Sequence, residues 1–86
     1  MVVVSRIMVA TDAPQEGRLE ITGEDRIRKI PIGSDPIPPP RPPIVIRVHA
    51  EHAPAKVILR SDDGAFLAGI VLDAGEHELL IERLRP

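Results

Sequence analysis

Apolar and polar residues alternate along most of this chain, and no run of ten or more residues has apolar side chains at helical spacing. Successive side chains of a strand point to opposite faces, so the alternation predicts β-strands, about seven in all. These lie in residues 1–32 and 44–86, on either side of a proline-rich segment at 33–43. We therefore expect a single all-β domain, a small immunoglobulin-like β-sandwich in which a three-stranded N-terminal arm and a four-stranded C-terminal unit are joined by a crossover.

The first predicted strand, residues 2–10, is apolar on both of its sides. Val2, Val4 and Met8 alternate on one side, whereas Val3, Ile7 and Val9 occupy the other. A strand with two apolar sides is typically buried on both. This strand is therefore predicted to lie either inside the fold or against another subunit.

The predicted strand at residues 26–32 has an irregular pattern. Its apolar positions step from Ile27 to Ile30, which breaks the period of two, so we expect a bulge near residues 28–29. Pro31 cannot donate a ladder hydrogen bond, which indicates that this strand lies at a sheet edge.

The segment 33–43 is predicted to be a stiff connector, because six of the eight residues from Pro36 to Pro43 are proline. A polyproline path of this length spans roughly 25 Å at about 3.1 Å per residue. That is enough to cross between sheets or to carry the N-terminal strands onto a neighbouring molecule. Residues 36–41 also match the Pro-x-x-Pro-x-Arg pattern of SH3 ligands, although a connector is our preferred interpretation.

Residues 55–84 contain two turn signals between strand-like runs. Asp63-Gly64 predicts a hairpin with a type I′ turn, in which both central residues have positive φ, and residues 73–75 predict a second turn. His77 follows at a corner where its ring could bond a backbone carbonyl. The residues expected to shape these corners are Asp63, Gly64, Gly75 and His77.

The order of these features resembles the PEGA-type and related immunoglobulin-like repeats. The resemblance rests on the 63–64 turn, Gly69, the Ala-Gly-Glu-His run at 74–77 and the alternating Leu79 and Ile81. The chain departs from that pattern because Gly69 is followed by Ile-Val-Leu rather than by the usual proline. Membership would imply a non-catalytic module with a surface or interaction role.

Composition excludes several classes of protein. Without cysteine there are no disulfides, and a net charge of −2 with Phe66 as the single aromatic residue argues against nucleic-acid binding. The excess of arginine over lysine and the ten prolines resemble the composition of a heat-adapted protein. The apolar start is too short to span a membrane and lacks the charged leader of a secretory signal, so a cytoplasmic or virion-associated protein is expected.

No catalytic, cofactor or metal site is predicted. His49 and His52 lie three residues apart without a third ligand at a standard spacing, and Asp62 and Asp63 fit turn chemistry better than a calcium site. Neither a nucleophile context nor a glycine-rich phosphate loop is present.

We therefore expect a non-enzymatic protein that self-associates or joins a larger assembly such as a coat, decoration, filament or tail. A ligand-binding accessory module for peptide or carbohydrate is the alternative, and a small OB-type nucleic-acid binder is a further one. Partners would be proteins, without nucleic acid or membrane. The predicted interface residues come from the first strand and the connector: Val2, Val4, Ile7, Met8, Val9, Pro38, Pro39, Pro40 and Arg41.

Overall fold

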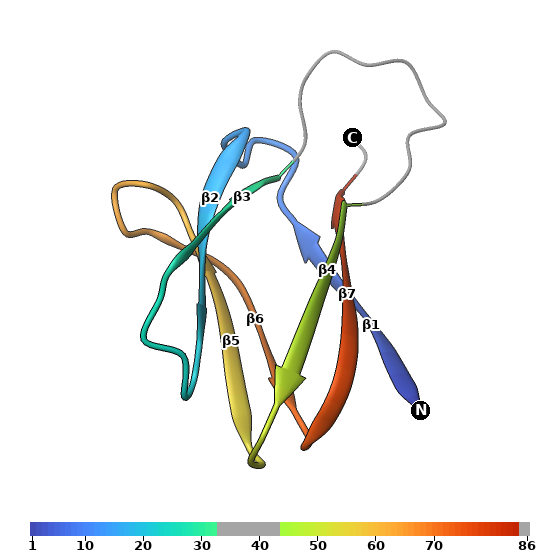
Figure 1. Cartoon of the computed structure of the whole chain (residues 1–86). Coiled ribbons are helices and arrows are strands. Elements are labelled where there is room, and N and C mark those ends of the chain that lie inside the picture. Colours follow the sequence, from blue (N-terminus) through green and yellow to red (C-terminus); the bar gives the residue numbers. More distant parts are fainter. Residues whose placement is uncertain (33–43, 85–86) are drawn as a thin grey trace.

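The computed structural model describes residues 1–32 and 44–84, which form two β-sheets without a helix (Figure 1). Seven strands are present in this part of the chain, as the alternation predicted. They are β1 (Val2–Val9), β2 (Glu16–Ile21), β3 (Arg28–Pro31), β4 (Ile44–Ala50), β5 (Ala55–Arg60), β6 (Phe66–Leu72) and β7 (Gly75–Arg83). No helix in these residues is long and apolar enough to cross a bilayer.

The first sheet has the order β1-β7-β4, with β7 at its centre. β1 pairs with β7 in parallel, from Val2 opposite Glu76 to Val9 opposite Arg83, without a shift in register. β4 pairs with the other side of β7 in the antiparallel direction. β1 and β4 are therefore the two edge strands of this sheet.

The second sheet has the order β3-β2-β5-β6, and all of its pairings are antiparallel. Each sheet therefore combines strands from residues 1–32 with strands from residues 44–84, so the expected three-stranded N-terminal arm and four-stranded C-terminal unit are not separate sheets. The proposed connector at 33–43 lies outside the described residues.

The edge position of β3 is confirmed, but the bulge expected near residues 28–29 is wrong. β3 begins only at Arg28, so Ile27 precedes the strand and is exposed. The odd step in the apolar pattern is therefore not inside a strand. The irregularity in this sheet lies between Leu59 and Arg60, where the pairing of β5 with β6 shifts register.

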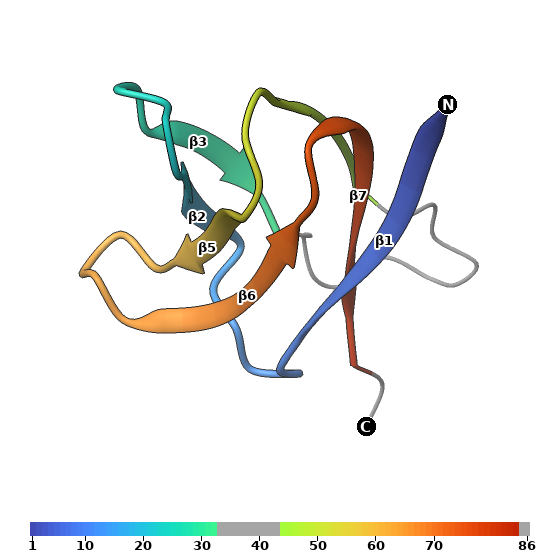
Figure 2. The same cartoon turned by 90° about the horizontal axis from the view of Figure 1, so that it is seen from below.

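An aliphatic core lies between the two sheets. Figure 2 shows the arrangement of the two sheets from below. Both sheets contribute fully buried side chains, among them Val9 and Leu79 from the first sheet and Leu19 and Leu59 from the second. Removing such a side chain costs about 2–5 kcal/mol when leucine is truncated to alanine. The alternation seen in the sequence is thus the division between the core side and the solvent side of each sheet.

The hairpin joining β5 to β6 is present, but its turn is not type I′. Gly64 has φ of 94°, whereas Asp63 and every other non-glycine residue of the described chain has negative φ. Ser61 N–H donates to the carbonyl of Ala65 at 2.9 Å, and Gly64 N–H donates to the carbonyl of Ser61 at 2.9 Å. These bonds are typical of a three-residue loop with one glycine in the left-handed region.

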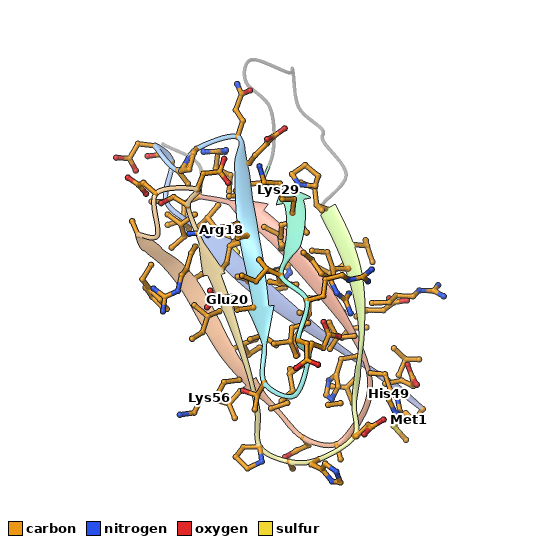
Figure 3. The ribbon with its side chains drawn as sticks, turned by 60° about the vertical axis from the view of Figure 1, so that its left-hand side comes forward. Met1, Arg18, Glu20, Lys29, His49 and Lys56 are labelled. Carbon is orange, nitrogen blue, oxygen red and sulfur yellow. The ribbon has the colours of Figure 1, made fainter. Side chains whose placement is uncertain are left out.

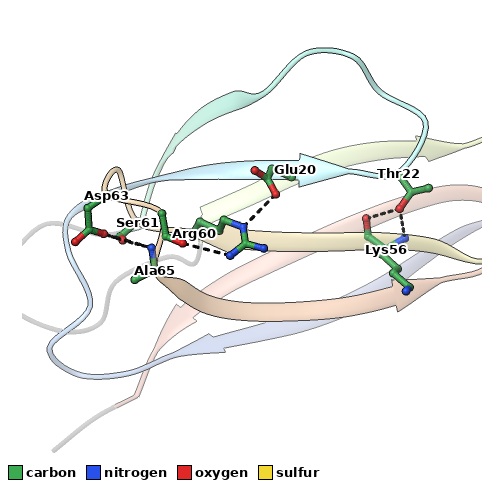
Figure 4. A network of polar contacts seen from close by, with 8 residues as sticks. Glu20, Thr22, Lys56, Arg60, Ser61, Asp63 and Ala65 are labelled. Carbon is green, nitrogen blue, oxygen red and sulfur yellow. Dashed lines mark hydrogen bonds and ion pairs between the residues drawn. The ribbon is translucent and has the colours of Figure 1, made fainter.

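Side-chain bonds fix this turn (Figure 4). The Ser61 hydroxyl donates to the Asp63 carboxylate, and Ala65 N–H lies 3.3 Å from the same carboxylate. Because both bonds favour the ionised form, they lower the pKa of Asp63 below its ordinary value. The Asp63 carboxylate therefore has a local structural role in the turn.

Candidate functional site

The most unusual surface of the molecule is the N-terminal half of β1. In Figures 1 and 2 this part of the strand extends away from the second sheet, toward the N-terminus. Val2, Val3 and Val4 are 51%, 47% and 56% exposed, although they are consecutive apolar residues in a regular strand. Isolated exposed apolar residues are common on proteins, but a contiguous apolar group on a sheet edge is not.

The structure divides the predicted interface set into two groups. Met8 is exposed together with Val2 and Val4, whereas Ile7 and Val9 are buried in the core of the chain itself. The prediction that Ile7 and Val9 contact a partner is therefore wrong for their side chains. Pro38, Pro39, Pro40 and Arg41 lie outside the described residues.

Val3 was missing from that set, although its neighbours on both sides were included. It shares the core-facing side of β1 with Ile7 and Val9, but near the N-terminal end of the strand this side is not covered. Sequence alternation assigns a side chain to a face but does not show where the opposite sheet ends.

The free edge of β1 presents unpaired backbone groups. Leu84 N–H donates to the carbonyl of Val9 at 2.8 Å, so the peptide groups of Val9 face β7. Backbone groups alternate between the two edges of a strand. The peptide groups that point to the free edge are therefore those of Val2, Val4, Arg6 and Met8. In the described chain β7 is the one strand that pairs with β1, so these groups have no ladder partner.

The solvent face of the first sheet carries ion pairs centred on the glutamates of β7. Arg6 lies 3.5 Å from Glu82, and Arg47 lies 3.5 Å from Glu78. His49 Nδ1 lies 2.5 Å from a carboxylate oxygen of Glu76. Exposed pairs of this kind contribute about 0–1 kcal/mol each. They neutralise the face without forming a binding site.

At the opposite edge of the same sheet, a side chain of the second sheet contacts one outward backbone group of β4. Arg28 at the start of β3 donates from Nη1 to the carbonyl oxygen of Arg47, at 3.0 Å. Its guanidinium is held in place by Glu24, with Nη2 to Oε1 at 2.6 Å. The edge of β4 therefore has a hydrogen-bond partner within the chain.

Three cations lie side by side on the solvent face of the second sheet. The register places Lys29 and Arg60 on either side of Arg18, and Figure 3 shows Arg18 and Lys29 on adjacent strands. Like charges directly opposite each other are destabilising. Carboxylates offset this charge, because Glu20 lies 3.2 Å from Arg60 and Asp62 lies 3.9 Å from Lys29.

The three histidines differ in their surroundings. His77 is buried, and its Nε2 lies 2.7 Å from the carbonyl oxygen of Asp73, so this nitrogen donates and closes the corner before β7. Gly75, with φ of 124°, supplies the left-handed conformation that this corner needs. His49 and His52 are exposed, and no group of three or more metal-ligating side chains occurs in residues 1–32 and 44–84.

Comparison with known proteins adds no further constraint. No family, no curated protein and no solved structure matches this chain. The resemblance of residues 55–84 to PEGA-type repeats therefore stays a prediction, and function has to be argued from the surfaces described above.

Proposed function

We propose that this protein is a non-catalytic assembly component that self-associates through the free edge of β1. The observation that carries the proposal is the run of three half-exposed valines, Val2 to Val4, on a strand that pairs on one side only. Burying this apolar surface against a partner would be favourable at roughly 25 cal/mol per Å². Pairing the outward backbone groups would add directional hydrogen bonds.

The sequence of β1 supports association because it lacks the features that normally prevent edge pairing. Soluble proteins protect edge strands with lysine, proline, bulges or a covering segment. Residues 2–9 contain no lysine or proline, and their pairing with β7 has no bulge. The single charge, Arg6, is directed to Glu82 on the face of the sheet.

A protein chain is the partner class that this edge fits. A second strand can satisfy alternating N–H and C=O groups, whereas a nucleic acid or a small anion would leave the apolar valines uncovered. A role in a coat, decoration, filament or tail is consistent with such a surface. The described residues contain no group of three or more metal-ligating side chains on which a metal-dependent reaction could be argued.

A lysine placed on the β1 edge tests the proposal. Val4→Lys should weaken self-association about tenfold or more in Kd, because the charge must be desolvated at the contact. Val45→Lys is the matched control, since Val45 is a similarly exposed valine on the same face of the same sheet, but in β4. Sedimentation velocity over a range of concentrations measures both variants against the wild type.

We expect the wild type and Val45→Lys to associate to the same degree. Val4→Lys should sediment as a monomer at concentrations where the wild type and Val45→Lys sediment as dimers. A wild-type protein that stays monomeric up to millimolar concentration would refute self-association. Equal weakening by the two lysines would show that the contact is not specific to β1.

A further inference from the structure

We infer that β1 pairs with β1 of a second copy in the antiparallel direction, with the two-fold axis passing through Val4. This inference rests on the proposed self-association and specifies its geometry. The resulting sheet would run β4-β7-β1-β1′-β7′-β4′, where primes mark the second copy. Its two ends would be β4 strands, whose edge Arg28 already covers.

The backbone pattern limits which residues can face each other. Only the even-numbered residues of β1 direct their peptide groups to the free edge, so even residues must pair with even residues of the second copy. A two-fold axis that passes through a single residue of β1 pairs even residues with even residues. Val3, Val4, Ser5 and Arg6 are therefore all possible positions for the axis. The choice among these positions depends on their side chains.

Charge excludes two of these positions. An axis on Arg6 would place the two arginines directly opposite, and an axis on Ser5 would make them diagonal neighbours at roughly 7–8 Å. With the axis on Val4, Arg6 lies opposite Val2′, and Val2′ is itself paired with Glu76′. The positive charge of Arg6 then lies on the same side of the sheet as the carboxylate of Glu76′, with Val2′ between them.

Coverage of the valines separates the remaining two positions. An axis on Val3 would pair Val2 with Val4′ but would leave Arg6 beyond the end of the partner strand. An axis on Val4 places Val4 opposite Val4′, Val3 opposite Ser5′ and Val2 opposite Arg6′. All three exposed valines are then inside the contact, and the two arginines are far apart.

The proposed contact would close as a dimer rather than polymerise. A two-fold contact uses one surface of each copy, so it is complete once two copies meet. Growth of the sheet at its outer ends would require the edge of β4, where the carbonyl of Arg47 already accepts a hydrogen bond from Arg28. A closed dimer is therefore the expected unit of assembly.

Disulfide trapping can locate the axis, because the natural chain contains no cysteine. In a hydrogen-bonded antiparallel pair, residues on the axis have Cα atoms about 5.5 Å apart, inside the roughly 4.4–6.8 Å range that a disulfide bridges. Mild oxidation of the folded protein should therefore convert most of Val4→Cys into a covalent dimer. A non-reducing gel measures the dimer fraction. Val45→Cys, on the covered edge, should stay monomeric.

A mixture of two variants gives the decisive result. Val3→Cys and Ser5→Cys should each crosslink poorly alone. In the proposed register position 3 is diagonal to position 3′, and position 5 is diagonal to position 5′, which is too far for a disulfide. Mixed together they should form a heterodimer, since Val3 lies opposite Ser5′ in the proposed register. Efficient crosslinking of either variant alone would overturn the Val4 axis.

Two further outcomes separate the geometry from the proposed function. If all three β1 cysteines crosslink equally while the protein associates, the contact has no fixed antiparallel register, and the proposed geometry is wrong although self-association stands. If the wild type is a monomer in sedimentation and no variant crosslinks, both proposals fail together.

Discussion

β1 and β4 are the two edges of one sheet, and they differ in how their backbone is covered. Both pair with β7, and each carries an outward valine that is 51% exposed, Val2 in β1 and Val45 in β4. On β4, however, Arg28 donates to the carbonyl of Arg47. Among the described residues, β1 pairs with β7 alone. The comparison leads us to expect association where exposed valines lie beside a backbone edge without a ladder partner, and not where a valine is exposed alone.

The largest expected effect separates the two halves of β1. Ile7→Ala should destabilise the fold by about 2–5 kcal/mol, because Ile7 is buried and its truncation leaves a cavity. Val3→Ala should change the stability of the monomer by less than about 0.5 kcal/mol, because Val3 is half exposed. Urea unfolding at a concentration where the chain is monomeric measures both.

The assembly should respond in the opposite order. Val3→Ala removes apolar surface from the proposed contact, so it should weaken association although it barely affects folding. Equal losses of stability in the two variants would show that the N-terminal half of β1 is packed in the monomer, and the distinction between the halves would be lost.

Much of the fold was predictable because alternation reports directly on the division between core and solvent. The seven strands, the edge position of β3 and the hairpin at residues 63–64 all follow from local residue patterns. The parallel pairing of β1 with β7 joins opposite ends of the chain, and no local pattern specifies such a partner. The sequence therefore showed that β1 is apolar on both sides but not that its two halves have different surroundings.

The covering of β4 was equally hidden in the sequence. In the sequence, Arg28 draws notice only as part of the bulge predicted near residues 28–29. Its role depends on the second sheet placing it beside Arg47, nineteen residues away, while Glu24 orients its guanidinium. Arginine side chains reach far enough that spacing along the chain does not reveal which carbonyl they contact.

An intermediate effect is expected when Arg28 is removed. Arg28→Ala should cost about 1–2 kcal/mol of stability, because it deletes a hydrogen bond to Arg47 and a half-buried pair with Glu24. It should also uncover the edge of β4. If both edges of the sheet can then pair, closed dimers should give way to larger species, which light scattering detects.

Glu24→Gln is the matched control for this substitution. It weakens the ion pair but keeps the arginine and its bond to the carbonyl of Arg47. We expect the control to remain dimeric. Larger species in the control, or a dimer unchanged by Arg28→Ala, would show that Arg28 does not limit pairing at β4.

The smallest expected effect is that of salt, and it tests what covers each edge. At 1 M ionic strength the Debye length is about 3 Å, so the exposed pairs of Arg6 and Arg47 on the sheet face should be largely screened. Association through β1 depends on apolar burial and backbone hydrogen bonds, so sedimentation in high salt should show a dimer as tight as in low salt. The edge of β4 should stay covered as well, because the bond from Arg28 ends on a neutral carbonyl rather than on a carboxylate. Salt should therefore fail to reproduce the larger species expected from Arg28→Ala. A dimer that dissociates in high salt would instead show that charge interactions of the sheet face, and not burial of the valine edge, stabilise the contact.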